Sequence, residues 1–450
     1  MTADHHQIIV VGGGIAGLAA AHVLGADHEV LLLEGSPQVG GKLRMAEVAG
    51  VTVDVGAEAM LNRRPEAVEL VRELGLSVVH PTSATSWVWS RGELHRLPRS
   101  LMGVPFDLDE LAASGVLSPE GLDRARSEVV RPWNGADVAV GDLVAARLGD
   151  ELVDRLVEPL LGGVYAGRAR EISAEAAMPQ LVAMAARGAI LRQAAAIPVS
   201  DVPVFAGIEG GVGQLPGALV DTGRFAVRTD ATVRALRRVA GGLELTVGSA
   251  RAPETLVAER VVLATPPAPT ARLLDSVAPG SAAVLATIET ASVAVVTFAF
   301  RAEELPDLSA MSGFLVPPVE GRRIKASTFS FAKWEWVRAA GDGLLLLRTS
   351  LGRHRDEASL QATDAELVTA SLVDLRAMVA ITATPVETHV QRWGGALPQY
   401  AVGHRARMER VRAGLEGSGV AVCGAAYDGV GIPAVIGSAR RAAALVGAAQ

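Results

Sequence analysis

The feature that most constrains the fold of this chain is a glycine-rich turn close to its first residue. The sequence GGGIAG (residues 12–17) directly follows the apolar run IIVV (residues 8–11), and LAAAHVL then continues at helical spacing. A strand, a glycine turn and a helix, followed by a second apolar strand over 28–34, predict a βαβ unit with a parallel sheet. The glycines permit a tight turn, let the backbone approach a pyrophosphate and let the helix pack against the strand. The turn therefore predicts dinucleotide binding.

Acidic and glycine residues after the turn extend this prediction. Glu34 ends the second strand, near the spacing at which an acidic side chain receives a ribose hydroxyl group. The pair Gly40-Gly41 follows six residues later, and NAD-binding units do not need it. Lys42 and Arg44 come next, and either contact the nucleotide or are solvated charges after a turn. We expect phosphates at the start of the first helix, where free N–H groups and the helix dipole favour negative charge.

Two further loops are candidates for the same site. Residues 56–58 follow a short predicted strand, and either pass beside a bound ring system or form an ordinary β-turn. Residues 424–433 (GAAYDGVGIP) join a predicted strand to a predicted helix. Backbone N–H groups at such a helix start can stabilise negative charge that develops during a reaction. A helix cap is the alternative, and one loop can serve both roles.

The remaining pattern predicts interleaved domains. Residues 60–200 carry helical patterns, strand signals return over 205–300 and 324–350, and a helix is predicted over 364–380. The last fifty residues repeat the order strand, loop, helix. No repeat or low-complexity linker divides the chain, so we expect its first and last segments to meet in one nucleotide-binding sheet.

Composition excludes several other classes of protein. The formal net charge is −7, from 42 basic and 49 acidic residues, so the basic surplus typical of nucleic-acid binding is missing. The sequence contains no run of 18 or more apolar residues, so it predicts no transmembrane helix. The single cysteine, Cys423, allows neither an intrachain disulfide nor a cysteine-based metal site, and the nine histidines show no metal-ligand spacing. With no secretory signal in its first residues, the chain is predicted to be cytoplasmic.

Several stretches together resemble one family, the oxygen-dependent porphyrinogen oxidases, which are FAD enzymes of haem biosynthesis. The resemblance covers nearly the whole chain. It is most specific in GVYAG, IKASTFS and ALPQYAVGH. The matching stretches are residues 10–21, 40–41, 55–76, 158–173, 204–219, 261–267, 313–334, 392–404 and 424–436.

The resemblance implies an α/β fold in which an amine-oxidase-like, Rossmann-type FAD-binding domain is interleaved with an α+β substrate domain and a helical domain. Membrane-associated relatives contact the bilayer through the helical part, so peripheral contact with a membrane is part of the expectation. The implied divisions are 1–60, 204–285 and 392–450 for the FAD domain, 61–90 and 286–391 for the substrate domain, and 91–203 for the helical domain.

Position by position, the resemblance also implies which residues line FAD. They come from the glycine turn, the Gly40-Gly41 extension, the 56–59 loop and the C-terminal loop. The full set is Gly12, Gly13, Gly14, Ile15, Ala16, Gly17, Glu34, Gly35, Gly40, Gly41, Lys42, Leu43, Gly56, Ala57, Glu58, Ala59, Val233, Trp393, Gly424, Ala425, Val430, Gly431 and Ile432.

The implied reaction removes six electrons and six protons from a porphyrinogen, in three rounds that each end with O2 reoxidising the flavin and yielding hydrogen peroxide. Coproporphyrinogen III carries four carboxylates and protoporphyrinogen IX two, and extra carboxylates favour extra cationic side chains. The expected substrate is therefore coproporphyrinogen III, with protoporphyrinogen IX as the alternative. A coproporphyrin ferrochelatase is an expected transient partner. The candidate carboxylate-binding residues are Arg63, Arg64, Arg168, Arg170 and Lys325.

Each of these cationic residues has a plainer interpretation, because surface arginines abound in this chain. No side chain stands out in the sequence as a catalytic base. An amine oxidase or a desaturase on the same fold is a further alternative. An amine oxidase usually lines its flavin with aromatic side chains, for which Tyr427 and Trp393 are the weak candidates. A carrier protein that shares the fold without flavin is a non-enzymatic alternative, against which the two glycine-rich loops argue.

Overall fold

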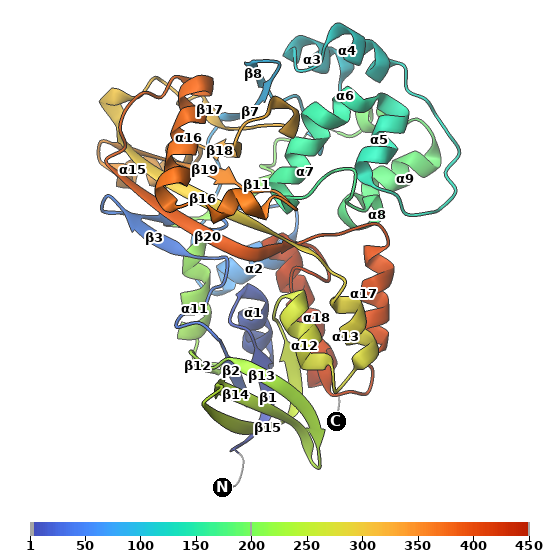
Figure 1. The fold of residues 1–450 in the computed structure, drawn as a ribbon, viewed down its shortest axis with the longest axis vertical. Coiled ribbons are helices and arrows are strands. Elements are labelled where there is room, and N and C mark those ends of the chain that lie inside the picture. The colour runs from blue at the N-terminus through green and yellow to red at the C-terminus, as the bar shows by residue number, and fades with distance from the viewer. Residues whose placement is uncertain (1–3, 199, 449–450) are drawn as a thin grey trace.

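Two seven-stranded sheets organise the structure, a computed structural model that describes residues 4–198 and 200–448. The first sheet and its helices form the lower lobe in Figure 1. The second sheet lies above it on the left, and a group of helices lies above it on the right. Each of the two sheets combines strands that are distant in the sequence.

The first sheet has the strand order β12-β2-β1-β15-β14-β13, and β21 also pairs with β15. β1 runs parallel to both β2 and β15, which confirms the predicted βαβ unit. Because β15 also pairs in parallel with β21, the prediction that the first and last segments share one sheet is confirmed. The strands are β1 (Asp4–Val11), β2 (Val30–Leu33), β12 (Ala226–Arg228), β13 (Val233–Val239), β14 (Gly242–Ser249), β15 (Ala252–Leu263) and β21 (Val420–Val422).

Helices cover both faces of this sheet because its central strands are apolar on both sides. Ile8 and Val10 of β1 pack into one core with α1 and α18, whereas Ile9 and Val11 pack into another with α12, α13 and α17. Parallel strands buried on both faces have this continuous apolar pattern. The helices are α1 (Ile15–Leu24), α11 (Leu215–Asp221), α12 (Pro267–Leu274), α13 (Pro279–Leu285), α17 (His404–Ala413) and α18 (Ile432–Gly447).

The second sheet has the order β20-β16-β19-β18-β17-β7-β8, and α16 covers its outer face. Residues 60–200 were predicted to be helical, and β7 and β8 correct this. The segment TSWVWS mixes aromatic and β-branched residues that favour a strand paired in the sheet. The elements are β7 (Thr85–Ser90), β8 (Glu93–Arg96), β16 (Thr290–Arg301), β17 (Met311–Leu315), β18 (Ile324–Thr328), α14 (Ser330–Lys333), α15 (Glu335–Gly341), β19 (Leu344–Leu351), α16 (Asp364–Val379) and β20 (Glu387–Pro398).

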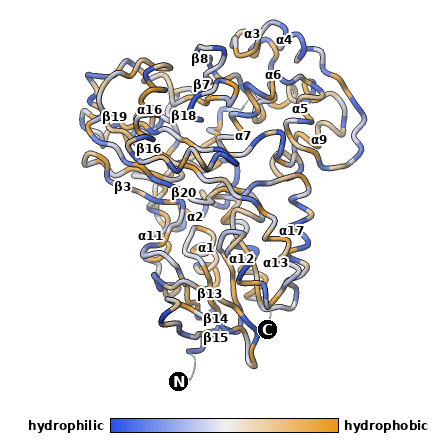
Figure 2. The backbone as a smooth tube through the Cα atoms, in the orientation of Figure 1, coloured by the Kyte–Doolittle hydropathy of each residue, from blue (hydrophilic) through white to orange (hydrophobic). Residues whose placement is uncertain are grey.

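The helical lobe has one core of its own, to which helices between α3 and α10 contribute. Its buried Arg147 donates to the carbonyl oxygens of Arg131, Ala185 and Gly188, so one guanidinium ties three segments together. Apolar and polar stretches are interspersed along its tube (Figure 2). Nowhere in the described ranges is a helix both long and apolar enough to cross a membrane. The helices are α3 (Leu108–Ser114), α4 (Pro119–Arg126), α5 (Val140–Leu148), α6 (Asp150–Leu152), α7 (Glu158–Tyr165), α8 (Ala174–Ala177), α9 (Pro179–Arg187) and α10 (Ile190–Ala195), with a π-helical turn over Val153–Val157.

Packing differs from the predicted divisions of the chain at two places. Helix α2 (Pro65–Glu73) falls in the segment assigned to the substrate domain, yet its apolar face shares a core with α1 and α18. Strand β8 falls in the segment assigned to the helical domain, yet it pairs in the second sheet.

Three small sheets complete the fold. They are β3 (Met45–Val48) with β4 (Val51–Asp54), β9 (Ser100–Leu101) with β10 (Val104–Pro105), and β11 (Phe205–Ile208) between β5 (Met60–Leu61) and β6 (Val78–Val79).

Candidate cofactor and substrate site

The glycine turn between β1 and α1 is built so that only glycine fits at its ends. Gly12 has φ +106°, and a Cβ there would lie 3.0 Å from the carbonyl oxygen of Ala264. A Cβ on Gly17 would lie 1.8 Å from the Gly12 carbonyl oxygen. A Cβ on Gly14, by contrast, would meet nothing within 4 Å, and no side chain caps the helix that begins after it. The helix start therefore presents N–H groups to an open space that suits a pyrophosphate.

Glu34 holds this turn against the end of β2. Its Oε2 accepts a hydrogen bond from the N–H of Gly13 at 2.6 Å, and its Oε1 accepts one from Ser36 at 2.8 Å. The carboxylate thus lies beside the turn, as its spacing predicts, and each oxygen keeps a lone pair with which to accept a ribose hydroxyl.

The Gly40-Gly41 pair lies directly on the glycine turn. The N–H of Gly40 donates to the Gly13 carbonyl oxygen at 2.7 Å, and a Cβ on Gly41 would lie 3.2 Å from the Cα of Gly14. Lys42 follows, with its Nζ donating to the Ala396 carbonyl oxygen at 2.8 Å. This side chain is exposed, yet desolvation by surrounding protein lowers its pKa.

The loop after β4 packs on the segment around Lys42. The N–H of Ala57 donates to the Lys42 carbonyl oxygen at 3.1 Å, and a Cβ on Gly56 would lie only 2.0 Å from that oxygen. The same Cβ would lie 3.2 Å from the Trp393 ring, whose Nε1 donates to the Val55 carbonyl oxygen at 3.4 Å. Three separate stretches predicted to line FAD thus meet here.

The C-terminal loop brings a second helix start to the same place. A Cβ on Gly424 would lie 3.7 Å from the Cβ of Ala16 at the start of α1. Helix α18 begins after Gly431 without a side-chain cap. The loop is fixed from both sides: the Tyr400 hydroxyl donates to the Ala425 carbonyl oxygen, and the Asp428 carboxylate pairs with Arg412 and Arg441. The loop that leads to α18 thus lies on the start of α1, and each of the two uncapped helix starts favours negative charge.

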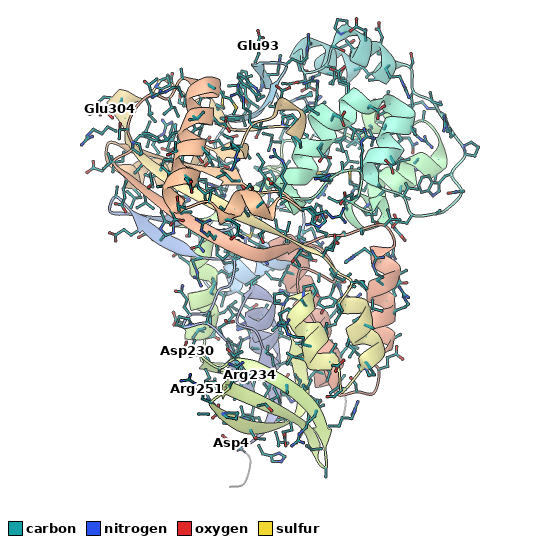
Figure 3. The ribbon with its side chains drawn as sticks, in the orientation of Figure 1. Asp4, Glu93, Asp230, Arg234, Arg251 and Glu304 are labelled. Carbon is teal, nitrogen blue, oxygen red and sulfur yellow. The ribbon has the colours of Figure 1, made fainter. Side chains whose placement is uncertain are left out.

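The opposite end of the site lies at the edge of the first sheet. The N–H of Ala231 donates to the Glu34 carbonyl oxygen at 2.8 Å, and a Cβ on Gly35 would lie 3.2 Å from the Thr232 hydroxyl oxygen. Val233 begins β13 next to this contact, between Asp230 and Arg234, which Figure 3 labels on the lower lobe. The predicted residues therefore extend from Val233 past the glycine turn to Trp393. This elongated track suits FAD, whose two halves are joined by a pyrophosphate.

Glu58 plays a different part from the glycines around it. Its buried carboxylate pairs with Lys333 at 2.6 Å and with Arg348 at 3.1 Å. Burial opposes its ionisation, but the two cations outweigh this effect and lower the pKa of Glu58 to about 2. Sequence reasoning missed Lys333 and Arg348. The available signal was a charged residue inside the apolar run LLLLRTSL of β19.

The inner face of the second sheet is incompletely covered. Val295, Ser350, Ala326 and Leu315 are neighbours in register across four strands, and each is partly exposed although it lies inside the sheet. Helix α7 faces this row, since a Cβ on Gly163 would lie 3.7 Å from the Leu315 side chain. A packed sheet centre would be buried, so this row of small and apolar side chains is only partly covered by the described residues.

The five candidate carboxylate-binding residues are not gathered in one place. Arg63 and Arg168 are exposed. Arg64 pairs with Glu66 at 2.7 Å in the lower lobe, and Arg170 pairs with Asp150 at 2.7 Å on the helical lobe. Lys325 alone is buried.

Lys325 lies at a β-bulge beside the half-open row, with Arg353 as its charged neighbour. Its Nζ donates to the Gly352 carbonyl oxygen at 3.0 Å, and Arg353 donates to the Val316 carbonyl oxygen at 3.0 Å. Within the part of the chain that the structure describes, no carboxylate oxygen lies within 4.0 Å of either side chain, although Glu158 and Asp356 act on Arg353 at longer range. Sequence reasoning did not single out Arg353.

The proposed aromatic candidates do not form a pair. Trp393 lies beside the 56–59 loop, whereas Tyr427 is buried in the core of the lower lobe with α12, α13 and α17. The aromatic lining that an amine oxidase would need is therefore not built from these two residues.

Comparisons with known proteins agree with this geometry. Residues 15–447 match the model of the family described as flavin containing amine oxidoreductase. A coproporphyrinogen III oxidase of Mycobacterium tuberculosis (strain ATCC 25618 / H37Rv) is 39% identical to the chain, over 96% of this chain and 95% of the relative. A coproporphyrinogen III oxidase of Bacillus subtilis (strain 168) is 29% identical, over 98% of both. A crystal structure from Exiguobacterium sp. 255-15 that bears the name protoporphyrinogen oxidase has a TM-score of 0.85 at 28% identity, over 100% of both chains. The chain therefore belongs to the flavin-containing amine oxidoreductase family, with the α/β FAD-binding fold and the flavin cofactor of that family.

Proposed function

We propose that this protein oxidises coproporphyrinogen III to coproporphyrin III, with three O2 as acceptors and three H2O2 as products. Six electrons and six protons leave the substrate, so the reaction balances. The observation that carries the proposal is the half-open row on the second sheet, bordered by the 56–59 loop and by the basic side chains of Lys325 and Arg353. Relatives of this chain that bear the name coproporphyrinogen III oxidase support the same choice.

The chain's own residues supply binding and orientation. When bound, FAD supplies the two-electron acceptor for each round. The glycine turn and the start of α1 would hold its pyrophosphate, and the loop over 56–59, Trp393 and the start of α18 would border its ring system. The uncapped start of α18 favours negative charge beside it.

The substrate would lie against the row of Val295, Ser350, Ala326 and Leu315, which is flat because the four residues share one sheet face. The row carries no carboxylate or imidazole. We therefore assign proton removal from the pyrrole nitrogens to solvent or to tautomerism of the macrocycle, not to a side-chain base. Among the described residues Lys325 has no acidic neighbour, so a substrate carboxylate beside it would favour its charged form, whereas Arg353 already has Glu158 and Asp356 at longer range.

Protoporphyrinogen IX, with two carboxylates, is the second candidate substrate. A coproporphyrin ferrochelatase is the proposed recipient of the product, and the proposal takes O2 as the acceptor because the resembled family uses it.

The test compares both porphyrinogens with the purified flavoprotein, following O2 consumption and porphyrin fluorescence in parallel. We expect coproporphyrinogen III to be preferred in kcat/KM, and K325M to lose more of this value with coproporphyrinogen III than with protoporphyrinogen IX. R170M is the matched control, because Arg170 is already paired with its own acidic neighbours. A preference for protoporphyrinogen IX would reverse the substrate choice, and activity on neither would send the assignment back to an amine substrate.

A further inference from the structure

Arg348 makes an unusual set of contacts with the loop that borders the proposed flavin site. It lies on β19 of the second sheet, two residues from Ser350 and therefore on the same inner face. Its Nη1 donates to the Gly56 carbonyl oxygen at 2.7 Å and to the Asp54 carbonyl oxygen at 3.3 Å, while its Nη2 lies 3.1 Å from Glu58 Oε2. The planar guanidinium group of Arg348 thus binds residues 54, 56 and 58, which are alternate residues of one segment.

The carboxylate that Arg348 binds is itself locked. Glu58 Oε1 accepts from Lys333 at 2.6 Å, and Ser330 Oγ donates to Glu58 Oε2 at 3.3 Å. Both partners come from α14, which follows β18 of the second sheet. Three side chains, those of Ser330, Lys333 and Arg348, therefore bind the loop from the side of the second sheet.

The other side of the loop faces the cofactor segments. Gly56 packs on the Lys42 carbonyl oxygen, and the Gly40-Gly41 pair before Lys42 lies on the turn that starts α1. A continuous series of direct contacts therefore joins Arg348 to the dinucleotide turn through Gly56 and Lys42. If Arg348 released Gly56, nothing else from the second sheet would bind that carbonyl oxygen among the described residues.

We propose that Arg348 is a positioning residue that fixes the 54–58 loop against the flavin and so couples the second sheet to the cofactor. The inference rests on the proposed function only in taking this loop as part of the flavin site. In this proposal Arg348 acts through the loop that it holds.

The test measures FAD binding to the apoprotein of R348M and R348K by quenching of flavin fluorescence, together with the midpoint potential of the bound flavin. R392M is the matched control, because Arg392 on β20 also binds two carbonyl oxygens and a carboxylate, but those of residues 360, 362 and 364. We expect the Kd for FAD to rise about tenfold or more in R348M, because several charge-assisted hydrogen bonds are lost. R348K keeps the charge without the fork and should show a smaller rise. R392M should bind FAD like the wild type.

A Kd within twofold of the wild type in both Arg348 variants, with an unchanged potential, would overturn the proposal. So would an equal loss in R392M, because the effect would then be general destabilisation. Wild-type protein that binds FAD but oxidises no porphyrinogen would overturn the proposed function and leave the role of Arg348 to be decided by the variants. Wild-type protein that binds no FAD would overturn both.

Discussion

Burial sets the protonation of two side chains near the site. Asp54 is buried, and although its carboxylate accepts from the N–H groups of Val212 and Gly213, desolvation raises its pKa to about 7. Lys325 is equally enclosed, and burial together with the Arg353 charge lowers its pKa to about 7. The two shifts have opposite signs, so they affect stability in opposite directions as pH changes.

K325M should be more stable than the wild type below pH 7. The unfolded chain holds the Lys325 proton up to a pH of 10.5, the folded chain only to about 7. The wild type therefore gains stability as pH rises between these values, while K325M does not. We expect an advantage of at least about 1 kcal/mol at pH 6 that shrinks by pH 9, measured by urea unfolding. A difference that does not change with pH would contradict the shifted pKa.

D54N should show the opposite trend. The folded chain keeps the Asp54 proton to about pH 7, the unfolded chain only to 3.8, so wild-type stability from this group falls as pH rises through that window. The amide of D54N carries no charge to desolvate and its oxygen can still accept a hydrogen bond. The stability of D54N relative to the wild type should therefore rise from pH 4 to pH 7.5 in the same unfolding experiment. A relative stability that stays constant or falls would exclude the raised pKa.

Sequence reasoning predicted the glycine turn and Glu34 beside it, but did not single out Arg348 and Arg353. Gly12, Gly14 and Gly17 are predictable because one turn fixes all three at known spacing. Arg348 and Arg353 were not, because their partners lie far away in the sequence and only the packing of the two sheets brings them near. The Lys325 prediction depended on a resemblance; its burial became visible only in the structure.

At the scale of elements, the contact between helices α1 and α18 matters most for cofactor binding, because both helices begin without a side-chain cap. Helices α1 and α18 share a core, so the apolar residues along each helix fix the position of the other. Any change that shifts α1 away from β1 should weaken binding at both starts.

G17A tests this packing. A Cβ at position 17 would lie 1.8 Å from the Gly12 carbonyl oxygen, so α1 must move away from the turn. We expect FAD content to fall at least about tenfold and the melting temperature to fall as well. G217A is the matched control, because Gly217 lies on α11 with nothing within 4 Å of its Cβ. That substitution should leave FAD content unchanged and raise stability by up to about 1 kcal/mol. Equal behaviour of the two variants would show that close packing at Gly17 is unimportant.

Elements with strong periodicity were predicted and short paired strands were not. The helix over 364–380 corresponds to α16, which carries a capping box at Thr363 and Glu366. Strands β5, β6, β9 and β10 contain two residues each, too few to show a period of two, and partners elsewhere in the chain stabilise them.

At the scale of the whole molecule, the length of the proposed FAD site determines which ligands can stabilise both lobes. The track extends from Val233 at the edge of the first sheet to Trp393 on the second, so a ligand that fills it stabilises both lobes. Binding to the folded state alone raises the free energy of unfolding by about 2.7 kcal/mol at a ligand concentration of 100 Kd.

FAD should therefore raise the melting temperature of the apoprotein more than FMN does at the same concentration, because FMN lacks the half that would lie near Glu34 and Val233. Differential scanning fluorimetry over a range of both ligands measures this. ADP, which lacks the flavin ring, is the complementary control and should also stabilise less than FAD. Equal stabilisation by FMN and FAD would show that the Glu34 end takes no part.

The position of β15 between β1 and β21 has a consequence for how a cell makes this protein. Translation releases the glycine turn first and the last strand of the same sheet some 400 residues later, which takes about 20 to 80 seconds at typical elongation rates. Throughout that time the nascent chain has the turn but lacks α18 and the loop before it, which we propose to border FAD. We therefore expect a polypeptide released before residue 420 not to retain FAD. Acquisition of the yellow flavin colour would then mark the chains whose synthesis had been finished.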